Sequence, residues 1–155
     1  MKKFLTIILA VLAVIMSFVL TGCEYRTPQT VEGFSNFMKA KEFTVQDVTA
    51  DTETNGLAKS VIVAVGKNFQ LEFYELNDSE TGEGVFYNNQ NIFDAEHSVK
   101  TASKEISSGN YNYYAFNADG DFHLIARVDN TMLYCVADKA YKDEIVNIVK
   151  ALGYN

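Results

Sequence analysis

The side chains best suited to nucleophilic or metal chemistry in this 155-residue chain are two cysteines, Cys23 and Cys135, and two histidines, His97 and His123. A cysteine is a strong nucleophile only where a neighbouring base or positive charge lowers the pKa of its thiol. Neither histidine stands in a sequence context that would supply such a base to Cys135. The two isolated histidines also lack the spacing of metal ligands and a nearby serine motif. We therefore expect no catalytic residue, no metal site and no cofactor, so the chain is not expected to be an enzyme.

The residues before Cys23 form a processing signal. Lys2 and Lys3 are followed by an apolar run over residues 4–20 and then by Leu20-Thr21-Gly22-Cys23. This arrangement resembles the signal peptide of bacterial lipoproteins, which ends in a lipobox. The resemblance implies cleavage before Cys23 and attachment of a diacylglyceryl group, with acyl chains such as palmitate, to its thiol.

The alternative for the apolar run is an uncleaved transmembrane anchor. The run lies at the short end of the roughly 17 to 25 residues that a spanning helix needs. Its flanks favour the lipoprotein signal, since a basic start and small residues before a cysteine are features of processing. We expect residues 1–22 to be the signal peptide, residues 23–27 the lipidated cysteine and a short tether, and residues 28–155 one domain. The protein is then expected on the extracytoplasmic face of the cell membrane, with the membrane as its partner through the N-terminal lipid.

The charge of the chain limits its other partners. The formal net charge is −7 and becomes −9 when Lys2 and Lys3 leave with the signal peptide. An acidic surface is repelled by phosphate groups, so we expect no nucleic-acid partner and no close adhesion of the domain itself to anionic lipid. With Cys23 lipidated, Cys135 has no disulfide partner within the chain. Its strand-like surroundings predict a small buried hydrophobic residue.

Two short motifs superficially indicate ligand sites. The segment from Asn117 to Asp121 is rich in oxygen ligands. A calcium loop, however, has a glycine at its sixth position and a glutamate at its twelfth, whereas here Gly120 is at the fourth position and Val128 is at the twelfth. A hairpin turn explains this segment better. The pair Gly82 and Gly84 lacks the remainder of a dinucleotide-binding fingerprint.

Tyrosines supply the best positive hint of a binding surface. Residues 110–117 alternate so that Tyr111 and Tyr113 lie on one face of a strand, with Tyr114 and Phe116 on the other. One tyrosine row is expected to meet solvent or a helix edge, and exposed tyrosines are common in recognition surfaces for proteins. Tyr111 and Tyr113 are thus candidate contacts for an envelope protein or a glycan, although the absence of tryptophan weakens the glycan version. The alternative is that both rings belong to the core.

Apolar periodicity and turn residues predict the elements that must position these side chains. Thr27 and Pro28 are expected to begin the first helix, and Asp138 and Gly153 to begin and end the last one. His123 should share the second face of the sheet with Ile125 and Arg127. The expected helices span about 28–41, 80–93 and 138–152, and the expected strands span 43–48, 59–65, 69–76, 99–106, 111–116, 122–128 and 132–136.

This order of elements predicts an α+β fold: a mostly antiparallel sheet of about six to seven strands packed with an N-terminal, a middle and a C-terminal helix. Two functions remain open at this level. The first is a membrane-anchored, non-catalytic binding or interaction module. The second is a small-ligand carrier or enzyme with a pocket between the sheet and the middle helix.

Overall fold

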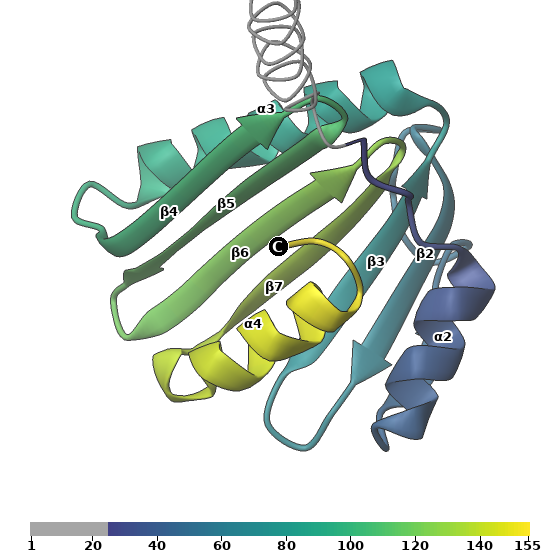
Figure 1. The fold of residues 1–155 in the computed structure, drawn as a ribbon, viewed down its shortest axis with the longest axis horizontal. Helices are drawn as coiled ribbons and strands as arrows, with labels where there is room; N and C mark the ends of the chain where they lie inside the picture. Colours follow the sequence, from purple (N-terminus) through teal and green to yellow (C-terminus); the bar gives the residue numbers. More distant parts are fainter. Residues whose placement is uncertain (1–24) are drawn as a thin grey trace, which may run out of the picture.

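A computed structural model describes residues 25–155, and the predicted signal peptide and Cys23 lie outside these residues. The helices are α2 (Val31–Ala40), α3 (Ser79–Glu96) and α4 (Lys142–Ala151), and a short 3-10 helix, η1 (Lys139–Tyr141), precedes α4. The strands are β1 (Thr44–Asp47), β2 (Ala58–Val65), β3 (Gln70–Leu76), β4 (Thr101–Ser108), β5 (Tyr111–Ala118), β6 (Asp121–Val128) and β7 (Thr131–Asp138). The α+β fold predicted from the sequence is confirmed (Figure 1).

All seven strands form one antiparallel sheet in the order β1-β2-β3-β7-β6-β5-β4. Two meanders, β1 to β3 and β4 to β7, therefore meet where β3 pairs with β7 in the register Phe73 opposite Leu133. Short turns join β2 to β3 and the successive strands of the second meander and impose antiparallel neighbours, whereas a longer loop over residues 48–57 joins β1 to β2. The long connection through α3 lets the second meander join the first at β7 instead of at β4.

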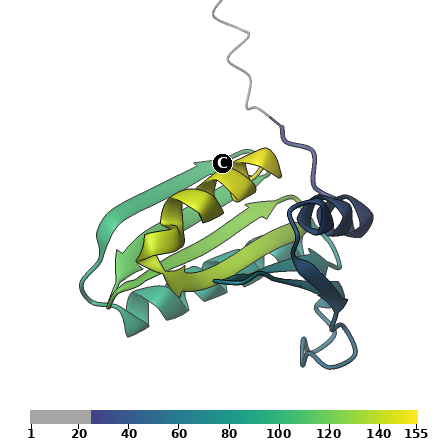
Figure 2. The same ribbon diagram turned by 90° about the horizontal axis from the view of Figure 1, so that it is seen from below.

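The helices cover both faces of the sheet. Helices α2 and α4 pack on one face, where the larger core contains Phe34 and Ile148, and α3 packs on the other, where Phe86 and Phe93 are buried. Figure 2 shows α4 and α3 on opposite sides of the sheet. Because side chains alternate along a strand, β5, β6 and β7 each contribute to both cores, whereas β4 is mostly exposed.

Helix ends depart from the sequence prediction at two places. Thr30, not Thr27, caps α2, since the Thr30 hydroxyl accepts a hydrogen bond from the Gly33 N–H at 3.0 Å. Asp138 caps η1 through the Ala140 N–H, so α4 begins one turn later than expected. The last helix is followed by Gly153 with φ +88°, a conformation that glycine adopts without strain, and the chain then turns back over the sheet.

Helix α3 begins at the Asp78 cap and lies close to the turn between β6 and β7. A Cβ atom at Gly82 would lie 2.6 Å from the Asp129 carbonyl oxygen, so only glycine permits this approach. No helix within residues 25–155 is long and apolar enough to cross a membrane.

Candidate functional site

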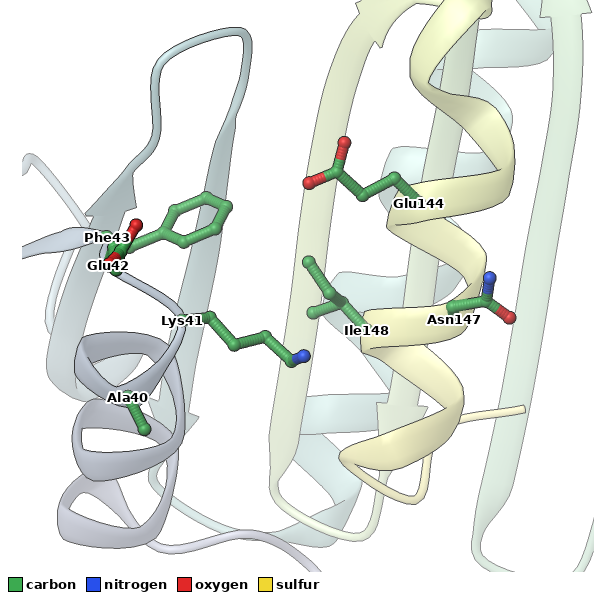
Figure 3. Close-up of a pocket in the computed structure, with 7 residues that line it drawn as sticks. All are labelled: Ala40, Lys41, Glu42, Phe43, Glu144, Asn147 and Ile148. Carbon is green, nitrogen blue, oxygen red and sulfur yellow. The ribbon is translucent and has the colours of Figure 1, made fainter.

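The largest hollow of the described chain is an open groove between α2 and α4 (Figure 3). It has a volume of about 670 Å³ and is lined by Ala40, Lys41, Glu42, Phe43, Glu144, Asn147 and Ile148. At one end Gln29 Nε2 donates a hydrogen bond of 3.2 Å to the Leu152 carbonyl oxygen, which joins the start of α2 to the end of α4. From there the helices diverge, so the groove opens toward Lys41 and Glu144 (Figure 1).

The α2 side of the groove is made by the chain reversal after that helix. Lys41 ends the helix, and Glu42 adopts a left-handed conformation with φ 66°. The Phe43 N–H then bonds to the Met38 carbonyl oxygen at 3.1 Å, which turns the chain into β1. The Phe43 ring packs against Phe69, with ring centroids 5.4 Å apart, and so stays beside the groove.

The α4 side combines an apolar residue with polar ones. Ile148 is 4% exposed and belongs to the core, whereas Glu144 and Asn147 are exposed. Glu144 lies in the first turn of α4, where a negative charge is favoured by the helix dipole. The groove therefore offers apolar surface from Phe43 beside the charged side chains of Lys41, Glu42 and Glu144, a combination suited to non-covalent binding. Cysteine, serine and histidine are absent from its lining.

The structure places the candidate contacts Tyr111 and Tyr113 in the interior of the domain, not on its surface. These side chains are 1% and 2% exposed and lie in the larger core. The C-terminal segment after α4 covers them, and the Tyr111 hydroxyl donates a 3.0 Å hydrogen bond to the Tyr154 carbonyl oxygen. Burial raises the pKa of both tyrosines to about 12. Neither ring is available as a surface contact, and the alternative of core residues is the one observed.

The two histidines come together at the end of α3, with ring centroids 4.4 Å apart. His97 Nδ1 lies 2.9 Å from Asp119 Oδ2, an ion pair whenever the histidine is protonated. His123 lies on the α3 face of the sheet, as the alternation with Ile125 and Arg127 predicts, and stacks on Phe116 at 4.8 Å.

His123 is 5% exposed, and neither of its ring nitrogens has a hydrogen-bond partner among the described residues. Burial, followed by the neighbouring His97, lowers its pKa. A buried neutral imidazole without a nucleophile beside it is a packed residue. Within residues 25–155 no group of three or more histidine, cysteine, aspartate or glutamate side chains is arranged to hold a metal ion.

Cys135 is buried, as its strand context predicts. Its thiol donates to the Gln70 carbonyl oxygen at 3.2 Å. Burial, with a smaller contribution from the charge of Glu72, raises the thiol pKa to about 12. The thiol is therefore protonated at neutral pH and is not an activated nucleophile.

Arg127 is a buried cation that the sequence analysis placed on the correct face but gave no role. It is 2% exposed, and its guanidinium donates to Asn112 Oδ1 at 2.7 Å and to the Asp129 carbonyl oxygen at 2.9 Å. Two longer bonds of 3.3 Å reach the Ser79 carbonyl and hydroxyl oxygens. These contacts join the start of α3 to the sheet, so the role of Arg127 is structural.

The pocket expected between the sheet and the middle helix is small. The hollow between α3 and strands β3 and β7 has a volume of about 180 Å³ and is lined by Tyr74, Val85, Asn89, Met132 and Tyr134. Ligand pockets usually measure about 300 to 1,000 Å³. A larger hollow of about 380 Å³ lies at the start of α3, beside Leu57 and Gly84, and is open to the surface as the groove between α2 and α4 is.

The groove residues were missed in the sequence because they come from segments about 100 positions apart. Lys41 and Glu42 break the helical pattern before a strand, but nothing in the pattern of α4 links Glu144 or Asn147 to them. No family model matches this chain, and no curated protein or solved structure is significantly similar to it. The function is therefore argued from the chain's own residues.

Proposed function

We propose that this protein is a membrane-anchored extracytoplasmic lipoprotein that acts as a non-catalytic interaction module. Cys23 carries the lipid, and the groove between α2 and α4 receives a segment of another envelope protein. The observation that carries the proposal is the open groove of about 670 Å³, lined by both apolar and charged side chains.

The shape of the groove favours a protein segment over an enclosed small molecule. Protein interfaces combine apolar and polar surface, and the lining of the groove does so through Phe43 with Lys41 and Glu144. The groove is open between the diverging ends of the two helices and can admit an extended segment, whereas small-ligand sites bury most of their ligand.

A small-ligand carrier or enzyme using the space beneath α3 is the second candidate. It receives less support, because the hollow between α3 and the sheet, at about 180 Å³, is below the usual size of a ligand pocket. The histidines near α3 do not support a ligand site or an active site there, since His123 is packed between aromatic rings.

A pair of charge reversals on α4 tests the groove. Glu144→Lys changes a residue that lines the groove, and Asp143→Lys makes the same change at the neighbouring exposed residue outside it. Both acids lie in the first turn, so the two variants lose the same favourable interaction with the helix dipole. Chemical cross-linking in intact cells, followed by purification of the lipidated protein, measures the partner bound.

We expect Glu144→Lys to lower partner recovery at least tenfold and Asp143→Lys to leave it near the wild-type level, with equal melting temperatures. Equal recovery of the partner with the wild type, Glu144→Lys and Asp143→Lys would show that the groove is not the binding surface.

A further inference from the structure

The chain is fixed to the folded domain almost directly after Cys23. The Arg26 N–H donates to Asn110 Oδ1 at 2.9 Å, and Asn110 Nδ2 donates back to the Arg26 carbonyl oxygen at 2.7 Å. The Arg26 guanidinium carbon lies 3.6 Å from the centroid of the Tyr111 ring, and Nη1 donates to the Gly153 carbonyl oxygen at 3.3 Å. Both the backbone and the side chain of Arg26 are therefore held.

The partners of Arg26 are rigid parts of the domain. Asn110 is 5% exposed and Tyr111 is 1% exposed, and both belong to the turn and strand that begin β5. The cation–π contact of the Arg26 guanidinium with the Tyr111 ring adds to two partly buried hydrogen bonds and one exposed hydrogen bond. The segment predicted as a tether of residues 23–27 is thus docked from Arg26 onward.

These contacts lie at one end of the sheet. The β4–β5 turn is joined to the β6–β7 turn by the bond from the Asp129 N–H to the Asn110 carbonyl oxygen, at 2.8 Å. The β6–β7 turn is joined in the same way to the end of β3, through Leu76 N–H and the Asn130 carbonyl oxygen at 2.8 Å. We call these turns and the start of α3 the anchor end. The β5–β6 turn at Asp119 lies at the other end of the same strands, about 23 Å away at the usual rise of about 3.3 Å per residue (Figure 1).

The distance from Cys23 to the domain is short. Only two residues, Glu24 and Tyr25, lie between Cys23 and Arg26, and an extended chain spans at most about 3.5 Å per residue step, so the three steps reach about 10 Å. Tyr25, within this stretch, is 73% exposed. Tyrosine is favoured at the boundary between lipid and water, where its ring and its hydroxyl find suitable surroundings.

We propose that the anchor end of the sheet faces the lipid bilayer at close range, and that the β5–β6 turn and the open end of the groove point away from the membrane. This orientation rests on the proposed lipid anchor at Cys23. The docked Arg26 and the short covalent link impose this orientation. Electrostatic attraction to the membrane does not contribute, because an acidic domain is repelled by anionic headgroups. A partner of the groove would then approach from the aqueous side.

Quenching by spin-labelled lipid headgroups tests the orientation. The probe is a fluorescent maleimide on Ser108→Cys at the anchor end or on Asp121→Cys at the opposite end, both at exposed positions. Lipidated protein purified from membranes is reconstituted into phosphatidylcholine vesicles containing headgroup spin labels. Cys135 is buried and its thiol is protonated, so it should react little with the maleimide and give a low background of labelling.

We expect fluorescence at position 108 to be quenched at least threefold more than at position 121, with little change in high salt. Asn110→Ala removes both backbone bonds to Arg26 and should reduce this difference, whereas Asn68→Ala, in the exposed turn between β2 and β3, should keep it. If Asn110→Ala does not fold, Arg26→Ala serves instead, because it removes the ring contact and the Gly153 bond from the surface.

The outcomes separate the orientation from the anchor. Equal quenching at the two positions in vesicle-bound protein overturns the orientation and leaves the lipid anchor standing. Protein with intact Cys23 that carries no acyl chain and does not enter vesicles overturns the anchor itself.

Discussion

At the scale of single residues, His123 is the clearest source of pH dependence. Its imidazole is buried beside Phe116, and burial, followed by His97, lowers its pKa, whereas Asp121, Asp119 and Glu96 act in the opposite direction. The unfolded chain takes up a proton near pH 6.5, but the folded domain takes it up only at lower pH. The free energy of unfolding should therefore fall as the pH decreases below about 6.5, by at most about 1.4 kcal/mol per pH unit.

The variant His123→Phe should flatten this dependence between pH 7 and pH 5, because an aromatic ring fills the space without binding a proton. Urea unfolding of both proteins at several pH values measures the slope. Carboxylates with lowered pKa values, such as Asp94, also contribute to the free energy of unfolding. They lose this contribution only as the pH falls through about 3.9 and below, outside the range from pH 7 to pH 5. An unchanged slope in the variant would mean that another group causes it.

At the scale of elements, two glycines of α3 should respond to alanine in opposite directions. Gly82→Ala places a Cβ 2.6 Å from the Asp129 carbonyl oxygen, so the helix or the turn must shift, at a cost of about 1 to 3 kcal/mol. Gly84→Ala meets nothing within 4 Å and should stabilise the domain by up to about 1 kcal/mol through helix propensity. Denaturant unfolding of the two variants checks this, and a gain in stability from Gly82→Ala would contradict the close approach.

The elements that the sequence predicted best are those with local signals. Strands β5, β6 and β7 were located within two or three residues, because Gly, Asn and Asp mark the turns between them. Strand β4 was placed two residues early at each end, since it is polar and exposed and its position is set by pairing with β5. The start of α2 was misplaced because Thr27-Pro28 and Thr30 both suit a helix cap.

Long-range arrangement was the part that local patterns could not provide. The groove depends on the pairing of β3 with β7, which places α2 and α4 on the same face. The burial of Tyr111 and Tyr113 likewise depends on α4 and the C-terminal segment returning over β5. Alternation along the strand correctly separated the two rows of side chains but did not show that both rows are covered by helices.

At the scale of the whole molecule, the proposal places the domain at the membrane through a lipid on Cys23. Cys23→Ala should abolish incorporation of labelled palmitate and prevent cleavage of the signal peptide at that position, because the thiol is the site of acylation. Metabolic labelling and membrane fractionation measure both effects. Cys135→Ala is the matched control and should be labelled normally. Labelled acyl chains on the Cys23→Ala protein would disprove the lipoprotein assignment.

The most direct test of the proposed interaction module is photo-cross-linking from the groove in intact cells. A benzoylphenylalanine replaces Asn147, which lines the groove, or Lys150, which is exposed on the same helix outside it. We predict a discrete cross-linked protein from position 147, absent from position 150 and reduced when Glu144→Lys is added. Cross-linking that is equal at both positions, or absent from position 147, would contradict the assignment of the groove as the site where this protein binds its partner.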